Sequence, residues 1–350
     1  MKKKILFLSL LISCYCFGQQ DTVYNINVLT PGTILNYVNI NSIDSITELT
    51  IKGLLNKTDI YAIKRLKSLK KLDISNASIQ YNKDALDDAI KTAQSNVEMA
   101  LSLAPAMLNR ALTPEEIQKI KIGSDLKIAK ITAKYKSNAM LEDELFKDFI
   151  NLELLYLPTN IEKIGKSTFY GCTNLKTIIL PQLLTTIEDG AFKNCINLKE
   201  IILPQLLTTI GDGAFESCLN LNEIIIPQKV TSIGESAFRN CILLKSCIIK
   251  GNIKEISNFL FEDCERLENI SIPSSVIEIY FNFILNCKSI KTIHCFSGEA
   301  PKCIFYNPRN YYPDEVDKNK RLDITFYYPK NSVTSYVVSV WNEYFTIKPE

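Results

Sequence analysis

Six of the eleven cysteines recur at a fixed interval of 23 residues, and such a series could serve metal binding, disulfide formation or redox chemistry. They are Cys172, Cys195, Cys218, Cys241, Cys264 and Cys287. In stacked coils they would form a straight column, whereas tetrahedral zinc needs four ligands around one point. Side chains that run parallel about 4.8 Å apart do not readily reach the Cβ separation of a disulfide. We therefore expect free, buried cysteines that pack as small apolar residues.

Other residues with reactive side chains are few. Cys295 and Cys303 lie outside this series, and a disulfide between them stays open. His294 is the one histidine, and strand alternation points it to the solvent side, away from any Cys/His or Ser/His/Asp arrangement. Carboxylates such as Asp189 and Asp212 recur in a turn, where we expect them to cap the next turn rather than bind calcium. Because no HExxH, GxSxG or Gly-rich phosphate loop is present, we predict a non-enzymatic protein without a cofactor or metal.

The N-terminus reads MKKKILFLSLLISCYCFGQQ, a basic start followed by an apolar run and then small or polar residues, which is typical of a secretory signal. We predict a signal peptide over residues 1–18, cleaved after Gly18. The segment LISC also fits a lipobox, so a lipidated N-terminus at Cys14 stays open as the alternative. In both cases the protein is expected to be secreted or held at the cell surface.

Charge and hydropathy argue against two classes of partner. Removing Lys2, Lys3 and Lys4 from the 40 basic residues leaves 37, against 38 acidic ones, so the mature net charge is about −1 and nothing points to nucleic acid. No later segment approaches the roughly 20 unbroken apolar residues that a membrane-spanning helix needs. We therefore expect no transmembrane segment in the mature chain.

The cysteine series belongs to a 23-residue repeat, I-G-x-x-x-F-x-x-C-x-x-L-x-x-I-x-L-P-x-x-L, which starts at Leu141 and restarts at Ile164 and every 23 residues to Ile279. In a solenoid like positions stack on like, and one coil buries its apolar side only against its neighbours. The L-x-x-I-x-L-P part predicts one short parallel strand per coil, ended by proline. The I-G-x-x-x-F-x-x-C part predicts a helical or 3₁₀ turn on the opposite side. Phe149 replaces the cysteine in the first copy, which supports a packing role for that position.

The same period extends towards the N-terminus. Leu69, Leu72 and Ile74 fit the leucine and strand columns, and so does an equivalent triplet 23 residues earlier. We assign residues 19–80 to an N-terminal cap and the first repeat coils. Residues 81–140 lack the repeat and are predicted to be a helical insertion. Its first helix would place Leu86, Ile90, Ala93, Val97 and Leu101 on one face, and a second would start at a capping box of Thr113 and Glu116 with Pro114 at its first position.

Residues 141–301 contain seven repeats, and the repeat then decays. Residues 302–350 are predicted to form a loop, a strand and an amphipathic helix capped by Ser332. That helix would place Tyr336, Val340 and Trp341 over the last coil. Such a cover is needed because the final coil of a solenoid otherwise exposes an apolar cross-section.

These motifs resemble the BspA-like branch of the leucine-rich repeat proteins, whose unit has the pattern I-G-x-x-A-F-x-x-C-x-x-L-x-x-I-x-L-P. Residues 141 to about 301 match the pattern in nearly every copy. The resemblance implies a leucine-rich repeat solenoid with one short parallel strand per coil, and an exported or surface protein that binds other proteins. The helical insertion departs from the pattern of the family. A fold alone does not give a function.

One face of the predicted sheet is a candidate binding surface. Alternation places a mostly apolar column on its outer side, made of Tyr156, Ile179, Ile202, Ile225 and Ile248, followed by Ser271 and His294. Lys176, Lys199, Lys245 and Lys291 run beside it. An exposed apolar column edged with lysine is typical of an interface. The alternatives are that isoleucine is favoured by its strand propensity or that the insertion covers the column.

The sequence thus leads to a hypothesis and two alternatives. The hypothesis is an exported, non-enzymatic protein for protein–protein interaction or adhesion, whose partner is a host, matrix or envelope macromolecule. The alternatives are a structural envelope scaffold without a specific ligand, and a glycan-binding protein.

Overall fold

The structure, a computed structural model, describes residues 22–37, 44–80, 91–92, 94–103, 112–113, 116–117, 119–120, 140–304, 323–337, 339 and 341–350. The predicted signal peptide with Cys14 lies outside these residues. So do Leu86, Ile90, Ala93, Pro114 and Val340, on which parts of the helix predictions rest.

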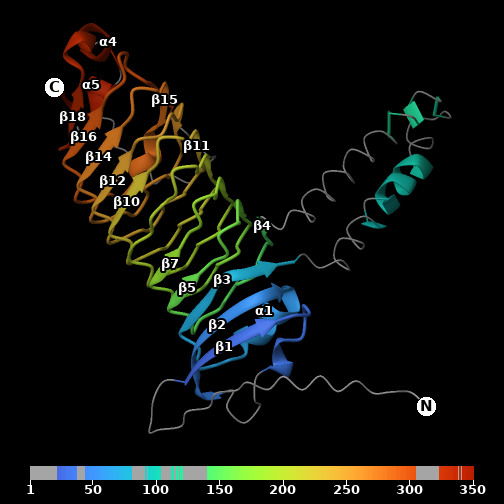
Figure 1. Ribbon diagram of the computed structural model, residues 1–350. Helices are drawn as coiled ribbons and strands as arrows, with labels where there is room; N and C mark the ends of the chain where they lie inside the picture. Colours follow the sequence, from blue (N-terminus) through green and yellow to red (C-terminus); the bar gives the residue numbers. More distant parts are fainter. Residues whose placement is uncertain are drawn as a thin grey trace, which may run out of the picture.

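The described chain forms an elongated stack of coils (Figure 1). Along one side lie two hydrogen-bonded parallel sheets in succession, which together we call the main sheet. The N-terminal part of this sheet contains β1 (Thr22–Val28), β2 (Ile46–Leu55), β3 (Lys71–Ile79), β5 (Leu154–Tyr156) and β7 (Thr177–Ile179). The C-terminal part contains β10 (Glu223–Ile226), β12 (Ser246–Ile249), β14 (Asn269–Ile272), β16 (Thr292–Cys295), β18 (Thr325–Tyr328) and β19 (Thr346–Pro349). Residues 201–203, in the coil between β7 and β10, are not assigned as a strand. The predicted repeat solenoid with short parallel strands is confirmed.

From Met140 to Ile304 each coil also contains a second strand that the sequence did not predict. The two sheets formed in this way contain β4 (Met140–Leu141), β6 (Lys163–Ile164), β8 (Thr186–Ile187), β9 (Thr209–Ile210) and β11 (Ser232–Ile233), and then β13 (Glu255–Ile256), β15 (Glu278–Tyr280) and β17 (Lys302–Ile304). Most are two residues long, with only the isoleucine of the I-G pair buried. Such short strands have no period-2 pattern, because alternation needs at least four residues to be recognised.

The turn side of each coil is built around a column of phenylalanines. Six rings stack on one another with centroids 5.1–5.8 Å apart: Phe146, Phe169, Phe192, Phe215, Phe238 and Phe261. All are fully buried. Within the coil, hydrogen bonds three residues apart tighten the turn, as between the Cys172 N–H and the Phe169 carbonyl at 3.2 Å. Between coils, the Phe192 N–H donates to the Ala214 carbonyl at 2.8 Å. This segment is the predicted 3₁₀-like turn.

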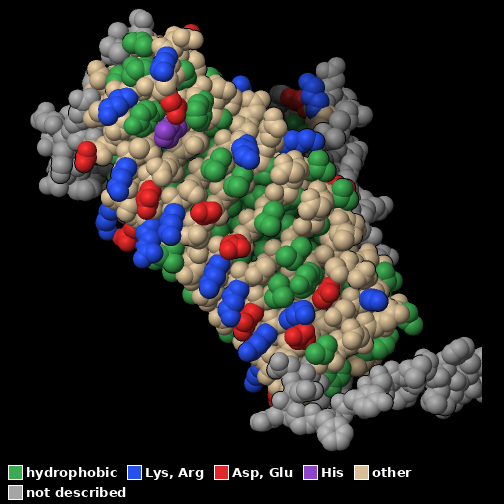
Figure 2. Space-filling model, turned by 60° about the vertical axis from the view of Figure 1, so that its left-hand side comes forward, with side chains coloured by type: hydrophobic (Ala, Val, Ile, Leu, Met, Phe, Trp, Pro, Cys, Tyr) green, Lys and Arg blue, Asp and Glu red, His purple; other side chains and the backbone are tan. Residues whose placement is uncertain are grey.

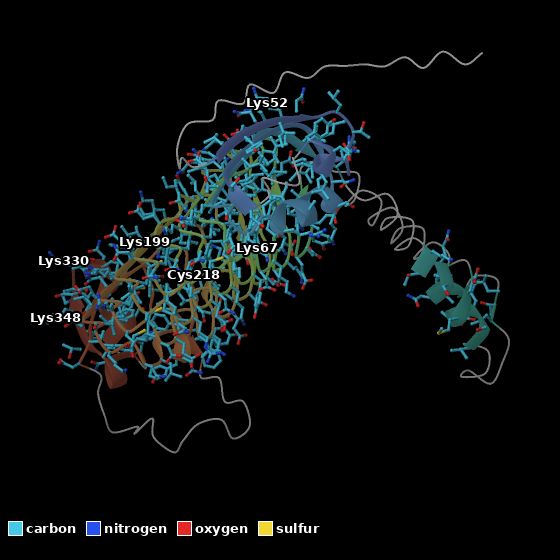
Figure 3. All side chains as sticks on the ribbon, turned by 90° about the horizontal axis from the view of Figure 1, so that it is seen from below. Lys52, Lys67, Lys199, Cys218, Lys330 and Lys348 are labelled. Carbon is cyan, nitrogen blue, oxygen red and sulfur yellow. The ribbon has the colours of Figure 1, made fainter. Side chains whose placement is uncertain are left out.

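The six cysteines of the series are free, and they make a contact that the sequence did not suggest. Each thiol donates a hydrogen bond to the carbonyl of the phenylalanine in the preceding coil, with Sγ···O distances from 3.0 to 3.3 Å. Cys218, for example, donates to Phe192 at 3.2 Å and lies inside the stack (Figure 3). The thiol therefore fills a small apolar site and also bonds two coils together.

The helical insertion lies between two strands that pair directly. Strand β3 pairs with β5, with Leu72 opposite Leu155 and Asp73 opposite Tyr156, so the 23-residue stacking continues across it. Residues 94–103 are helical, and the predicted capping box is confirmed, since Thr113 N–H donates to Glu116 Oε2 at 2.9 Å and Glu116 N–H to Thr113 Oγ1 at 3.3 Å. The described helical residues of the insertion project away from the stack (Figure 1).

A buried carboxylate holds the N-terminal end together. Helix α1 (Lys57–Lys64) starts at Asn56, which forms a capping box with Asp59. Asp59 is fully buried and also accepts hydrogen bonds from the N–H groups of Gly32 at 2.6 Å and Ile34 at 3.0 Å, the latter the first residue of the 3₁₀ helix η1 (Ile34–Asn36). One side chain therefore ties the loop after β1 to the start of α1.

The C-terminal cover differs in detail from the prediction. The chain forms a 3₁₀ helix η4 (Lys330–Ser332) and two short helices, α4 (Val333–Val337) and α5 (Trp341–Tyr344), instead of one helix capped by Ser332. Tyr336 and Trp341 are fully buried, as predicted. Trp341 Nε1 donates to the Pro301 carbonyl at 2.7 Å. The chain then adds strand β19, which pairs in parallel with β18. This strand was not predicted, because its sequence TIKP is too short and too polar to be recognised as a strand.

The glycines of the I-G pair leave room for an aspartate in the preceding coil. A Cβ on Gly165, Gly211 or Gly234 would lie 2.3–2.6 Å from Oδ1 of Asp143, Asp189 or Asp212, respectively. Those carboxylates accept hydrogen bonds from backbone N–H groups of the next coil, as expected for caps. The Glu235 N–H, for example, donates to Asp212 Oδ1 at 2.8 Å. Where the preceding coil lacks this aspartate, another residue replaces the glycine: Glu188 follows Lys166, Ser257 follows Glu235, and Tyr280 follows Asn258.

We predict that Gly234→Ala destabilises the protein by about 1–3 kcal/mol, because the added methyl group overlaps Asp212 and the backbone must shift. Gly298→Ala is the matched control, since its Cβ would meet nothing within 4 Å. Urea unfolding followed by circular dichroism measures both variants. Equal midpoints for Gly234→Ala and the wild type would contradict this account of the glycine column.

Candidate partner-binding face

The outer face of the main sheet displays the column of residues that the sequence places there. Tyr156 pairs in register with Ile179, Ile225 with Ile248, and Ile248 with Ser271. The four isoleucines Ile179, Ile202, Ile225 and Ile248, which we call the isoleucine ladder, are 48%, 84%, 51% and 42% exposed. Their sequence neighbours on both sides are buried where they point inward, so the alternation is that of a half-buried sheet.

Tyr156, at the N-terminal end of the ladder, is only partly exposed. The space-filling view shows hydrophobic side chains gathered in a band along the stack, with charged side chains of both signs at its border (Figure 2). The described helical residues of the insertion project away from the stack and do not cover the ladder. For the described residues, the explanations that stay open are an interface and strand propensity.

The predicted lysines differ in their ionic contacts. Lys176 Nζ lies 2.6 Å from Glu153 Oε2, and this hydrogen bond holds the pKa of Glu153 below its usual range. In the part of the chain that the structure describes, the side chains of Lys199 and Lys245 form no ion pair. Lys199 lies on the outside of the stack (Figure 3). These two lysines are therefore available to a carboxylate of a partner.

A column of polar residues that follows the strands of this face was also missed from the sequence. Gln182, Gln205 and Gln228 follow the strand prolines at the same period and are exposed. Their signal was present in the repeated Pro-Gln pair, but amides have no chemistry that draws attention to them. They place hydrogen-bond donors and acceptors three residues beyond Ile179, Ile202 and Ile225 in the chain.

His294 lies on the same face at its C-terminal end. Its ring stacks on Tyr327, with centroids 4.8 Å apart, and its Nδ1 lies 2.9 Å from Glu350 Oε1. The histidine is thus on the outer face as expected, and it also contacts the C-terminal residue.

Burial disfavours the thiolate form of the described cysteines in the 23-residue series. Burial raises the pKa of Cys172 and Cys287 to about 12 and also raises the pKa of Cys218. The disulfide left open between Cys295 and Cys303 is not formed, and Cys295 Sγ instead accepts a hydrogen bond from the Tyr336 hydroxyl at 3.3 Å. Within the described ranges no group of three or more potential metal ligands occurs.

A comparison with protein-family models matches six copies of the BspA type leucine rich repeat region, over residues 139–243 and 185–310. This chain is a BspA-type leucine-rich repeat protein. Repeats of this type are typical of binding scaffolds in protein–protein interaction.

Solved structures of leucine-rich repeat proteins are also similar to the chain. The T. pallidum leucine rich repeat protein is 30% identical, over 43% of this chain and 71% of that chain, with a TM-score of 0.41. A Bacteroides ovatus leucine-rich repeat protein is 23% identical, over 60% of this chain and 55% of that one, with a TM-score of 0.44. A leucine rich cell surface protein from Faecalibacterium prausnitzii is 21% identical, over 77% and 78%, with a TM-score of 0.37.

No curated protein matches the chain. The helices in the described portion of this BspA-type protein are all too short or too polar to cross a bilayer.

We predict that two adjacent isoleucines of this BspA-type repeat respond oppositely to substitution. Ile201 is 7% exposed and Ile202 is 84% exposed. Ile201→Ser should lower the free energy of unfolding by about 3 kcal/mol, since it removes buried apolar volume and buries a hydroxyl. Ile202→Ser should change it by less than about 1 kcal/mol, the range of strand propensity. Urea unfolding of both variants tests the orientation, and comparable losses would show that Ile202 is not a solvent-facing residue.

Proposed function

We propose that this protein is exported and that it binds a macromolecular partner through the outer face of its main sheet. We propose further that this partner is another protein. The observation that carries the proposal is the isoleucine ladder, four aligned isoleucines left at least 42% exposed. A face that did no binding would be expected to alternate with polar residues at these positions. The predicted signal peptide supports export, either as a free protein or with a lipid anchor at Cys14.

The chemistry of the face favours a protein. Exposed aliphatic side chains supply non-directional apolar contact area, and Lys199, Lys245 and the glutamine column supply polar contacts at its border. An apolar centre with a polar rim is the usual arrangement of a protein interface. A glycan-binding face would instead be expected to present flat aromatic rings, and the ladder positions contain isoleucine.

The alternative is a structural scaffold whose isoleucines reflect strand propensity alone. The coil that contains Ile202 bears on this, because its residues 201–203 are not assigned as a strand and yet it keeps isoleucine at the outer position. The most exposed isoleucine thus sits where a requirement for strand propensity is weakest. This favours binding over propensity.

The proposal is tested with a variant that removes the ladder. Ile202→Ser, Ile225→Ser and Ile248→Ser are combined in the mature protein, and pull-downs from host and envelope extracts are compared with the wild type. Burying one isoleucine is worth about 1.5–3 kcal/mol, so the triple variant should bind the captured partner at least about 100-fold more weakly.

The matched control combines Ile150→Ser and Ile277→Ser, which are 51% and 61% exposed but lie outside the ladder. This variant should bind like the wild type, and all proteins should show the same circular dichroism spectrum. Unchanged binding by the folded triple variant, or extracts that yield no partner at all, would contradict the proposed function.

A further inference from the structure

The apolar strip that the isoleucine ladder forms is one residue wide. Ile225 and Ile248 pair in register on neighbouring strands, and Ile202 belongs to the coil before them. Two residues before Ile202 and Ile225, alternation places the exposed Glu200 and Glu223 on the same outer face. In the other direction along the chain, the exposed glutamine column follows three residues later. The strip is therefore bordered by charge on one side and by amides on the other.

The length of the strip discriminates between two kinds of partner segment. Four equivalent positions in successive coils span about 14–15 Å, because neighbouring strands lie about 4.8 Å apart. On an α-helix, residues i, i+3, i+7 and i+10 share one face and span about 15 Å at a rise of about 1.5 Å per residue. In an extended strand, side chains on one face are about 6.8 Å apart, so four of them span about 20 Å. The ladder thus matches a helix and not a strand laid along it.

A sheet of a partner would match the spacing of the ladder but not its width. Sheets that pack face to face bury several columns of side chains at once. Glu200 and Glu223 would then be buried, and an unpaired buried carboxylate is strongly unfavourable. A helix is about 10–12 Å across, so on the ladder it reaches about 5–6 Å to each side. It covers the isoleucines and leaves the glutamates at its border, about 7 Å away along the strand.

The same two glutamates determine which charge fits beside the ladder. In the part of the chain that the structure describes, neither side chain forms an ion pair. Their coils are bonded directly, since the Asn222 N–H donates to the Lys199 carbonyl at 3.2 Å. Like charges at equivalent positions of neighbouring coils repel, and a basic side chain placed between them would offset that repulsion. Lys199 lies one residue farther from the ladder than Glu200, so the carboxylates are the first charges that a helix on the ladder meets.

We propose that the segment bound by the isoleucine ladder is an amphipathic α-helix that lies along the stack, across the strands. Its apolar residues at i, i+3, i+7 and i+10 contact the four isoleucines, and basic residues on one flank face Glu200 and Glu223. This inference rests on the proposed function, and it names the structure and the charge of the segment that the face recognises. Charged side chains of both signs border the hydrophobic band on which the helix lies (Figure 2).

Fluorescence anisotropy with three labelled peptides of about 15 residues tests the inference on the mature protein. The first is held helical by a lactam staple, with leucine at i, i+3, i+7 and i+10 and lysine on one flank. The second has the same composition with leucine at alternate positions, as in a strand. The third is the stapled helix with glutamate instead of lysine. The first peptide should bind at least about 10-fold more tightly than either of the others, the effect of one lost isoleucine contact.

Variants of the protein locate the bound peptide. The triple ladder variant, Ile202→Ser, Ile225→Ser and Ile248→Ser, should bind the first peptide at least about 100-fold more weakly. Glu200→Gln combined with Glu223→Gln should remove the preference for the lysine peptide over the glutamate peptide. The matched control combines Glu255→Gln with Glu299→Gln, two exposed carboxylates outside the main sheet, and it should keep that preference.

The outcomes separate this inference from the proposed function. Equal or tighter binding of the alternating peptide would overturn the helix, and so would a stapled helix that does not bind or that binds the triple ladder variant equally well. If the pull-down partner is nevertheless lost by that variant, the proposed function stands without the helix. A folded triple variant that still captures the partner overturns the proposed function, whichever peptide binds. A lysine preference that survives Glu200→Gln with Glu223→Gln would overturn the charge assigned to the helix.

Discussion

Each coil of this protein can bury its apolar side only against the coils before and after it, and the rest of the structure depends on that constraint. Equivalent residues must therefore stack on one another. The phenylalanine rings do so at 5.1–5.8 Å, and strand register pairs Leu49 with Leu72 and Leu72 with Leu155. Even the helical insertion respects the constraint, since β3 and β5 pair as if it were absent.

Stacking also explains which residue types each column accepts. A residue that stacks on its equivalent in the next coil must be small, apolar, or able to hydrogen-bond to that equivalent residue or to the backbone. The cysteines meet this demand, because each thiol is small and reaches the phenylalanine carbonyl of the preceding coil. The glycines meet it differently, since they make room for the aspartate that caps the next turn. The cysteine column, whose residue type suggests chemistry in the sequence, and the glycine column thus allow neighbouring coils to pack together.

Much of this could be predicted from the sequence, because the repeat shows the same pattern of residues in seven copies. The period identified the solenoid, the buried columns of Phe192 and Cys195, and the outward position of Ile202. Features that occur only once have no repeated sequence pattern that reveals them. The buried Asp59 clamp, the strand β19 and the division of the C-terminal helix depend on contacts between distant residues, as in the hydrogen bond from Trp341 to Pro301. The thiol hydrogen bonds were periodic, but their acceptor is a backbone carbonyl 26 residues away, which residue types do not reveal.

The central claim is that fit between neighbouring coils, rather than any particular coil, stabilises the fold. Deleting residues 187–209 removes one whole period and joins Thr186 to Ile210, the same dipeptide as Thr209–Ile210. Deleting residues 187–198 removes about half a period and places turn positions over strand positions. The account predicts that, in urea, the first variant retains the circular dichroism of a β-solenoid and one cooperative transition, while the second loses both. Loss of structure in the first variant would contradict the account.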